Sequence, residues 1–233
     1  MVFITGDIHG NPWPIYKFCQ RMKLTENDII ILLGDVGANY DNGAHDKGVK
    51  KILSSLAPTI LCIHGNHEQR PWNIPGYEIE SWKGGKVWVQ KEYPNLKFAK
   101  DGEIFLLNGL RYIVIGGAYS VDKEFRLLRG AGWWEDEQPS KSIKEFVEDQ
   151  LRKNQIDVIL SHTCPFKYEP VEMFLAGVDQ RNVDDSTERW LDKIEENIDY
   201  KAWFCGHWHT DKRIDRVHFL FKTFETTEFL TKG

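Results

Sequence analysis

Short apolar runs that are followed by glycine or other small residues and then by polar residues recur six times along this chain of 233 residues. The six stretches are VFITGDIHG (2–10), IIILLGDVG (29–37), TILCIHGNHE (59–68), YIVIGGAYS (112–120), VILSHTCP (158–165) and WFCGHWH (203–209). Continuous runs of Ile, Val and Leu are typical of strands that are buried on both faces. Glycine follows five of these runs and permits a sharp turn, so these five stretches predict buried strands that end abruptly.

Segments with apolar residues at helical spacing lie between these strands. They are residues 15–22 after Pro12 and Pro14, 47–56, 142–154 and 186–198, the last with its acids and bases expected on the solvent side. Strands that alternate with helices predict an α/β fold.

Residues 72–110 depart from this alternation. Alternating apolar residues and glycine turns there predict antiparallel hairpins, and residues 217–230 show a similar pattern. A pair of mixed sheets with helices outside is therefore favoured over a purely doubly wound sheet. The chain shows neither a linker nor a repeat, and we expect residues 1–233 to form a single domain.

The charge and the cysteines restrict the classes of function. A formal net charge of -5 argues against general binding to nucleic acids or membrane surfaces. Because the predicted first strand begins at Val2, we expect no signal peptide, and no apolar run reaches the roughly 18 residues of a membrane span. The cysteines lack CxxC spacing, which favours a reducing, cytoplasmic setting over a zinc knuckle or a disulfide scaffold. They are Cys19, Cys62, Cys164 and Cys205.

Polar side chains suited to metal binding follow five of the six strands. They are Asp7, His9, Asp35, Asn66, His67, His162, His207 and His209. In open α/β sheets, ligands bind beyond the carboxyl ends of the strands, so we expect these residues to converge. Carboxylates combined with imidazoles suit two transition-metal ions, with Mn²⁺ first and iron or zinc as alternatives. Glycines before these residues let the backbone pass close to the site; they are Gly6, Gly34, Gly65 and Gly206.

The last motif needs a break in the strand. His207 and His209 would point to opposite faces of a regular strand, because side chains alternate along it. Both reach one site only if the chain has already left the strand, which Gly206 permits.

The ordered set GDIHG, GDVG, GNHE, SH and GHWH resembles the calcineurin-like metallophosphoesterases over residues 6–209. The resemblance implies a four-layer αββα double β-sandwich flanked by helices. It also implies one ion held by Asp7, His9, Asp35 and His209. The second ion would be held by Asp35, Asn66, His162 and His207, with Asp35 as the bridge. His67 resembles the family's histidine that acts on the leaving group and binds no metal.

The predicted activity is the hydrolysis of a small phosphate ester or nucleotide, as a phosphatase or a phosphodiesterase. A water between the two ions would lose a proton and act as nucleophile. Gly37 and Ala38 stand where the protein Ser/Thr phosphatase branch has an Arg-containing motif, so that branch is disfavoured. A nuclease and a non-catalytic scaffold of the same fold remain alternatives; the net charge argues against a stable nucleic-acid partner, and the complete set of ligands argues against the scaffold.

The remaining histidines are assigned structural or solvent-exposed positions. We expect His45 to be solvated, His64 to be buried or to support a ligand, and His218 to lie outside the site.

The segment 118–140 has two interpretations. In the favoured one, Trp133 and Trp134 cover the sheet and the charges face water. In the other, the segment forms a rim over the ions, and Arg126 or Arg129 contacts a phosphate oxygen.

Overall fold

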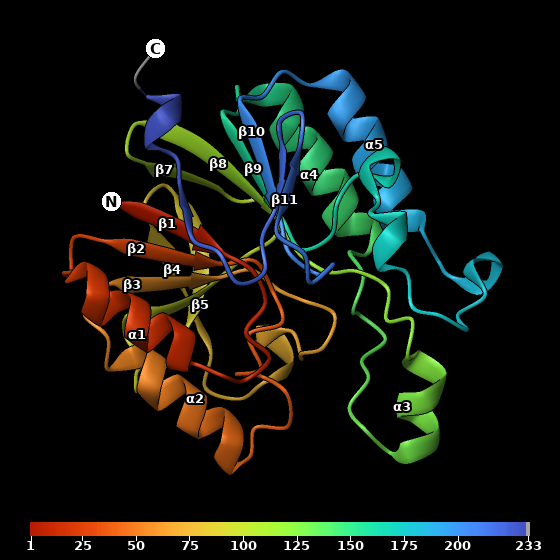
Figure 1. Cartoon of the computed structure of the whole chain (residues 1–233). Helices are drawn as coiled ribbons and strands as arrows, with labels where there is room; N and C mark the ends of the chain where they lie inside the picture. The colour runs from red at the N-terminus through yellow and green to blue at the C-terminus, as the bar shows by residue number, and fades with distance from the viewer. Residues whose placement is uncertain (232–233) are drawn as a thin grey trace.

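Two β-sheets pack face to face in the computed structural model, which describes residues 1–231 (Figure 1). The first sheet has the order β13 (Glu225–Thr226), β1 (Val2–Thr5), β2 (Ile29–Leu32), β3 (Thr59–Cys62), β6 (Leu96–Ala99), β5 (Gly85–Val89) and β4 (Glu78–Trp82). The second has the order β11 (Lys212–Ile214), β12 (Val217–Phe219), β10 (Ala202–Cys205), β9 (Val158–Ser161), β8 (Leu110–Ile115) and β7 (Ile104–Leu107).

Both sheets are mixed, as predicted. Strands β1, β2, β3 and β6 run parallel in the first sheet, and β8, β9, β10 and β12 run parallel in the second. The predicted hairpins are present as the antiparallel pairs β4–β5, β5–β6 and β7–β8. At the end of the chain, β12 pairs antiparallel with β11, and β13 pairs antiparallel with β1.

The helices cover the outer faces of the sheets and complete the four layers. In Figure 1, α1 (Trp13–Met22) and α2 (Ala44–Ser54) lie against the first sheet, and α4 (Lys141–Lys153) and α5 (Ser186–Asn197) lie against the second. Helix α4 begins where the Ser140 side chain accepts a hydrogen bond from the Ile143 backbone N–H at 3.3 Å. Helix α2 begins three residues earlier than the sequence predicts. None of the helices in residues 1–231 is both long and apolar enough to span a membrane.

The core occupies the space between the two sheets and the spaces beneath the helices. Ile4 and Ile31 belong to the cluster between the sheets, whereas their neighbours Phe3 and Ile30 belong to the cluster on the helix side. Both faces of these strands are therefore buried, which explains their uninterrupted apolar sequence. A rigid pair of sheets holds the loops at the strand ends in place.

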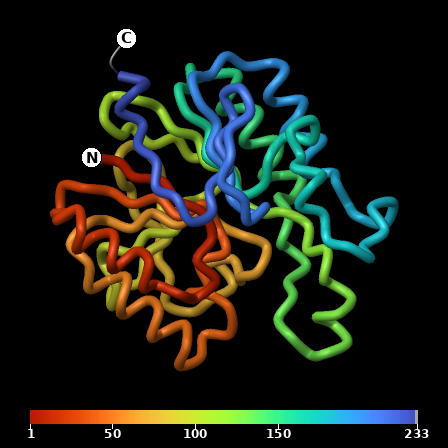
Figure 2. Tube along the Cα trace, viewed as in Figure 1, coloured from red at the N-terminus to blue at the C-terminus, as the bar shows by residue number. Residues whose placement is uncertain are grey.

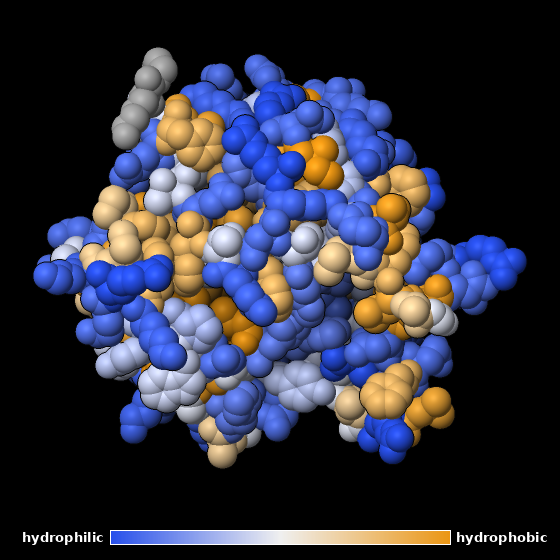
Figure 3. Space-filling view, viewed as in Figure 1, coloured by the Kyte–Doolittle hydropathy of each residue, from blue (hydrophilic) through white to orange (hydrophobic). Residues whose placement is uncertain are grey.

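A short arm between β8 and α4 was not predicted as a helix. It carries α3 (Lys123–Arg129), which buries none of its residues and projects from the body of the molecule (Figures 1 and 2). Figure 3 shows hydrophobic residues at the surface of this arm, and Phe125, Leu127 and Leu128 are exposed there. A helix without a buried face gives no amphipathic pattern for a sequence to reveal.

Candidate metal centre

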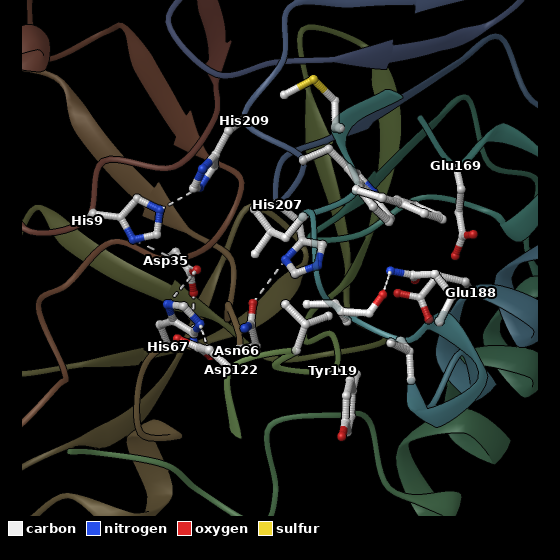
Figure 4. A pocket seen from close by; sticks show the side chains of 18 residues that line it. His9, Asp35, Asn66, His67, Tyr119, Asp122, Glu169, Glu188, His207 and His209 are labelled. Atoms are coloured by element: carbon white, nitrogen blue, oxygen red, sulfur yellow. Dashed lines mark hydrogen bonds and ion pairs between the residues drawn. The ribbon is translucent and has the colours of Figure 1, made fainter. Parts of the chain in front are cut away.

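The loops after β1, β2, β3, β9 and β10 bring all eight predicted site residues together. Potential metal-binding atoms lie within 4.8 Å of one another in three overlapping groups. The groups are Asp7–His9–His209, His9–Asp35–His67 and Asp7–Asp35–His162. The Asn66 Oδ1 atom joins them, because it lies 2.8 Å from His162 Nε2 and 3.1 Å from His207 Nδ1. Figure 4 shows the six of these residues that line a cavity, namely His9, Asp35, Asn66, His67, His207 and His209.

Unusual backbone conformations aim these side chains. His9, Asp35, His207 and His209 have φ values of 44°, 44°, 65° and 50°. Such left-handed conformations are rare outside glycine and cluster at functional sites. Strand β10 ends at Cys205, so the expectation that the chain leaves the strand before His207 and His209 is confirmed.

Two of the predicted glycines are required by close packing against the carboxylates. A Cβ atom at Gly65 would lie 2.0 Å from Asp35 Oδ1, and one at Gly206 would lie 2.3 Å from Asp7 Oδ1. Real Cβ atoms do not approach other atoms this closely, so a side chain at either position would displace a carboxylate.

The hydrogen bonds around Asn66 and His162 fit a bound cation. The Nδ1–H of His162 donates to the Leu33 carbonyl at 2.7 Å, which leaves the Nε2 lone pair facing Asn66. The Asn66 side-chain N–H donates to Ser120 Oγ at 2.8 Å, which turns its carbonyl oxygen toward the same point. With neutral imidazole, these two electron-pair donors repel each other unless a cation lies between them. A hydrogen bond that orients a ligating imidazole in this way is typical of metal sites.

The charges of the cluster also fit metal ions. Asp7 and Asp35 are buried, with exposed fractions of 4% and 3%. Burial would raise the pKa of Asp35, but the imidazoles around it, foremost His162, lower its pKa instead. Burial lowers the pKa of His9 and of His207. Deprotonated carboxylates and neutral imidazoles are the forms that bind metals.

His209 is held by a carboxylate. Its Nε2 atom lies 3.4 Å from Asp7 Oδ2 and 2.7 Å from His9 Nε2. The hydrogen bond with Asp7 raises the pKa of His209. His9 and His209 each present a ring nitrogen, and Asp7 presents its carboxylate, to the same space.

His67 occupies a distinct position at the edge of the cluster. Its backbone N–H donates to Asp35 Oδ1 at 2.8 Å, and its Nδ1 lies 3.7 Å from Asp35 Oδ2. On the other side, Arg126 Nη2 approaches His67 Nδ1 at 2.8 Å, and Asp122 Oδ1 lies 3.5 Å from His67 Nε2. The ring therefore lies within reach of the ligands and is also contacted by an arginine from α3.

Asp122 and Arg126 form the support for that ring. Arg126 Nε donates to Asp122 Oδ2 at 2.8 Å, one helical turn apart. Partial burial raises the pKa of Asp122, but its contacts with His67 and Arg126 outweigh burial and lower the pKa. Of the two arginines considered in the sequence, only Arg126 reaches the site; Arg129 is exposed and stacks on Phe125 at 5.5 Å.

Trp133 packs within the arm, whereas Trp134 packs against the loop that follows β2. Trp133 Nε1–H donates to Glu137 at 2.9 Å, and the Trp134 ring meets Tyr40 edge-on at 5.3 Å between centroids. Both are half-buried.

The other histidines lie where the sequence places them. His45 is exposed. His64 is buried, and His218 pairs with Glu225 at 2.6 Å, away from the cluster.

Sequence reasoning missed the residues that extend the site beyond the ligands. The cluster of candidate ligands opens into a cavity of about 270 Å³ whose lining includes Tyr119, Asp122, Glu169 and Glu188 (Figure 4). Glu188 was expected on the solvent face of the helix 186–198, and this expectation is wrong, since Glu188 is only 5% exposed. The irregular segment 166–183 covers this end of α5, and no periodic pattern marks such a covering segment. The i, i+4 spacing of Asp122 and Arg126 was the one available signal for that pair.

Comparison with known proteins agrees with this geometry. The sequence model of the calcineurin-like phosphoesterase family matches residues 1–211. The crystal structure of TT1561 of Thermus thermophilus has a TM-score of 0.53 at 12% identity, covering 94% of this chain and 87% of that chain. Phosphopantetheinyl hydrolase (PptH) of Mycobacterium tuberculosis has a TM-score of 0.40 at 15% identity, covering 94% of this chain and 87% of that chain. No curated protein matches the chain significantly.

The structural match to TT1561 shows a shared fold. The family model spans every predicted ligand from Asp7 to His209. The chain therefore belongs to the calcineurin-like phosphoesterase family, in which bound metal ions serve the hydrolysis of phosphoesters.

Proposed function

We propose that the protein is a hydrolase of small phosphate esters that uses two metal ions. The observation that carries this proposal is the convergence of two buried carboxylates, an oriented amide oxygen and five imidazoles beside one cavity. The proposed ligands of one ion are Asp7, His9, Asp35 and His209. The proposed ligands of the other are Asp35, Asn66, His162 and His207.

The chemistry of the donors guides the choice of metal. Mixed imidazole and carboxylate ligands favour Mn²⁺, with iron or zinc as alternatives. When bound, such ions supply Lewis acidity that activates water and neutralises charge on a phosphoryl group. Asp35 is the candidate bridge because its two oxygens face different groups, Oδ1 toward His162 and Oδ2 toward His9.

His67 is proposed to hold the proton that the leaving oxygen needs. Arg126 Nη2 lies 2.8 Å from His67 Nδ1, and Asp122 Oδ1 lies 3.5 Å from His67 Nε2, so these two side chains orient the ring. A neutral imidazole does not release its single N–H, so the form that acts on the leaving oxygen would be the ring protonated on both nitrogens.

Replacing Arg126 by alanine tests this support. We expect kcat/KM to fall by about 10–100-fold, the usual cost of removing a group that orients a site residue. Metal content should stay at the wild-type level, because Arg126 contacts His67 and Asp122 but none of the proposed ligands. Arg129→Ala is the matched control on the same helix. A normal rate in the Arg126 variant, with only a lower unfolding temperature, would assign Arg126 to folding of the arm.

The cavity argues for a small substrate. None of the described residues that line it is lysine or arginine, and a nucleic-acid backbone needs such side chains. The free, buried cysteines support a cytoplasmic setting, where thiols stay reduced.

The proposal is tested with a panel of esters. Metal-stripped protein is supplied with Mn²⁺, Fe²⁺ or Zn²⁺ and assayed on alkyl phosphate monoesters, a dialkyl diester, a cyclic nucleotide and single-stranded RNA. Metal-dependent turnover of at least one small ester is expected, and the preferred class decides between phosphatase and phosphodiesterase. Turnover of RNA alone would favour the nuclease, and no turnover with any ion would favour the non-catalytic scaffold.

A further inference from the structure

The cavity beside the proposed metal centre has a second, chemically different end. Figure 4 shows His9 and His209 on one side, His207 and Asn66 in the middle, and Glu169 and Glu188 on the far side. All of these residues line the same cavity of about 270 Å³. A substrate whose phosphate lies at the metal end would therefore extend toward two carboxylates.

The wall between the two ends is apolar. It is formed mainly by the segment after β9 and by one residue of the GHWH motif. The apolar residues are Met173, Phe174, Leu175, Val178, Val183 and Trp208. Phe174 stacks on Trp208 with 5.8 Å between the ring centroids. Such a wall favours a hydrocarbon portion of a ligand over a second phosphate.

Glu188 lies at the far end without a full set of partners. It is 5% exposed, and its Oε2 atom is buried with no hydrogen-bond partner among the described residues. A buried carboxylate oxygen without a partner is costly, so native proteins pair such groups. A residue that faces a cavity can be paired by a ligand that enters it.

The surroundings of Glu188 are negative. Burial raises the pKa of Glu188 to about 7, and burial together with the neighbouring Glu188 raises the pKa of Glu169 to about 7. The nearby negative charges of Asp185 and Asp184 also raise the pKa of Glu188. No lysine or arginine is among the described lining residues; Arg189, which acts on Glu169 from outside the lining, is already paired with Asp185 at 2.7 Å.

We propose that Glu169 and Glu188 form a subsite for an ammonium group, so that the substrate is a phosphate ester of an amino alcohol with an apolar spacer. The phosphate would lie at the metal end, the spacer along Phe174 and Trp208, and the amine between the carboxylates. This inference rests on the proposed hydrolase function and specifies its substrate class.

Three matched esters test the subsite in the metal-loaded protein. They are 6-aminohexyl phosphate, hexyl phosphate and 5-carboxypentyl phosphate, which share a spacer and differ in the charge of the far end. We expect KM for the amine to be about 10–100-fold lower than for hexyl phosphate, because a charge pair in a desolvated pocket is strong. The carboxylate ester should be the poorest substrate.

Substitutions then test whether Glu169 and Glu188 cause the preference for the amine ester. Glu188→Gln and Glu169→Gln are each expected to raise the ratio of the KM for 6-aminohexyl phosphate to the KM for hexyl phosphate toward one. Glu196→Gln, which removes an exposed carboxylate from the same helix, should leave the ratio unchanged. Because the ratio is measured within one variant, a loss of total activity through misfolding does not alter it.

The outcomes separate the two proposals. Hydrolysis of all three esters with equal KM values overturns the ammonium subsite and leaves the hydrolase function intact. An unchanged ratio in both glutamine variants also overturns it. If none of the three esters is hydrolysed with any metal but an ester of the earlier panel is, the proposed substrate class is wrong. If no ester of the panel is hydrolysed either, the proposed hydrolase function is wrong.

Discussion

Replacing Asp35 by asparagine is expected to remove most of the bound metal and to lower kcat by about 10³-fold, the scale on which loss of one charge-stabilising group acts. The carboxylate is 3% exposed and lies among His9, His67 and His162, so no solvent-exposed acid can replace it. Asparagine has nearly the same shape but lacks the charge and one acceptor oxygen. The measurement is metal content per chain by elemental analysis, together with the rate of ester hydrolysis.

A control separates this effect from general loss of an acid. Asp199→Asn makes the same chemical change at a fully exposed side chain whose contact with Arg216 is 3.5 Å long. Both variants should be folded by circular dichroism, and Asp199→Asn should keep wild-type metal content. Full metal occupancy with normal turnover in Asp35→Asn would contradict the assignment of Asp35 as a ligand shared by two ions.

Replacing His67 by alanine is expected to slow alkyl phosphate hydrolysis by about 10²–10⁴-fold, the usual contribution of a general acid. A p-nitrophenyl ester should slow far less, because its leaving oxygen is stable without a proton. Metal content should not change, since His67 is assigned to the leaving group. The measurement is kcat for both esters under saturating metal.

Other results would assign a different role to His67. Equal slowing of both esters would mean that His67 positions phosphate or the nucleophile. Loss of metal would place it among the ligands, an arrangement that its distances to His9 and Asp35 also permit.

The sequence predicts the double sheet and the convergence of the site residues for a common reason. Buried parallel strands need continuous apolar runs, and these runs end at one edge of each sheet, where GDIHG, GDVG and GNHE place Asp7, Asp35 and Asn66. Both signals are local in sequence, so each can be recognised without knowing how the sheets pack.

The rest of the site depends on contacts that are distant in sequence. Helix α3 has no buried face, yet Arg126 reaches His67 across a separation of 59 residues. Glu188 has the polar character of a solvent-exposed helix position, but the segment before α5 folds over it and creates the cavity. Such coverage is a tertiary effect, and no local pattern in residues 166–188 predicts it.

Titration of metal-stripped protein with Mn²⁺, followed by bound ions per chain and by ester hydrolysis in the same samples, tests the two-ion centre most directly. We expect two ions to bind per chain, with hydrolysis absent from the stripped protein and complete when the second ion is bound. Full hydrolysis by the stripped protein, or saturation of both signals at one ion per chain, would contradict the account.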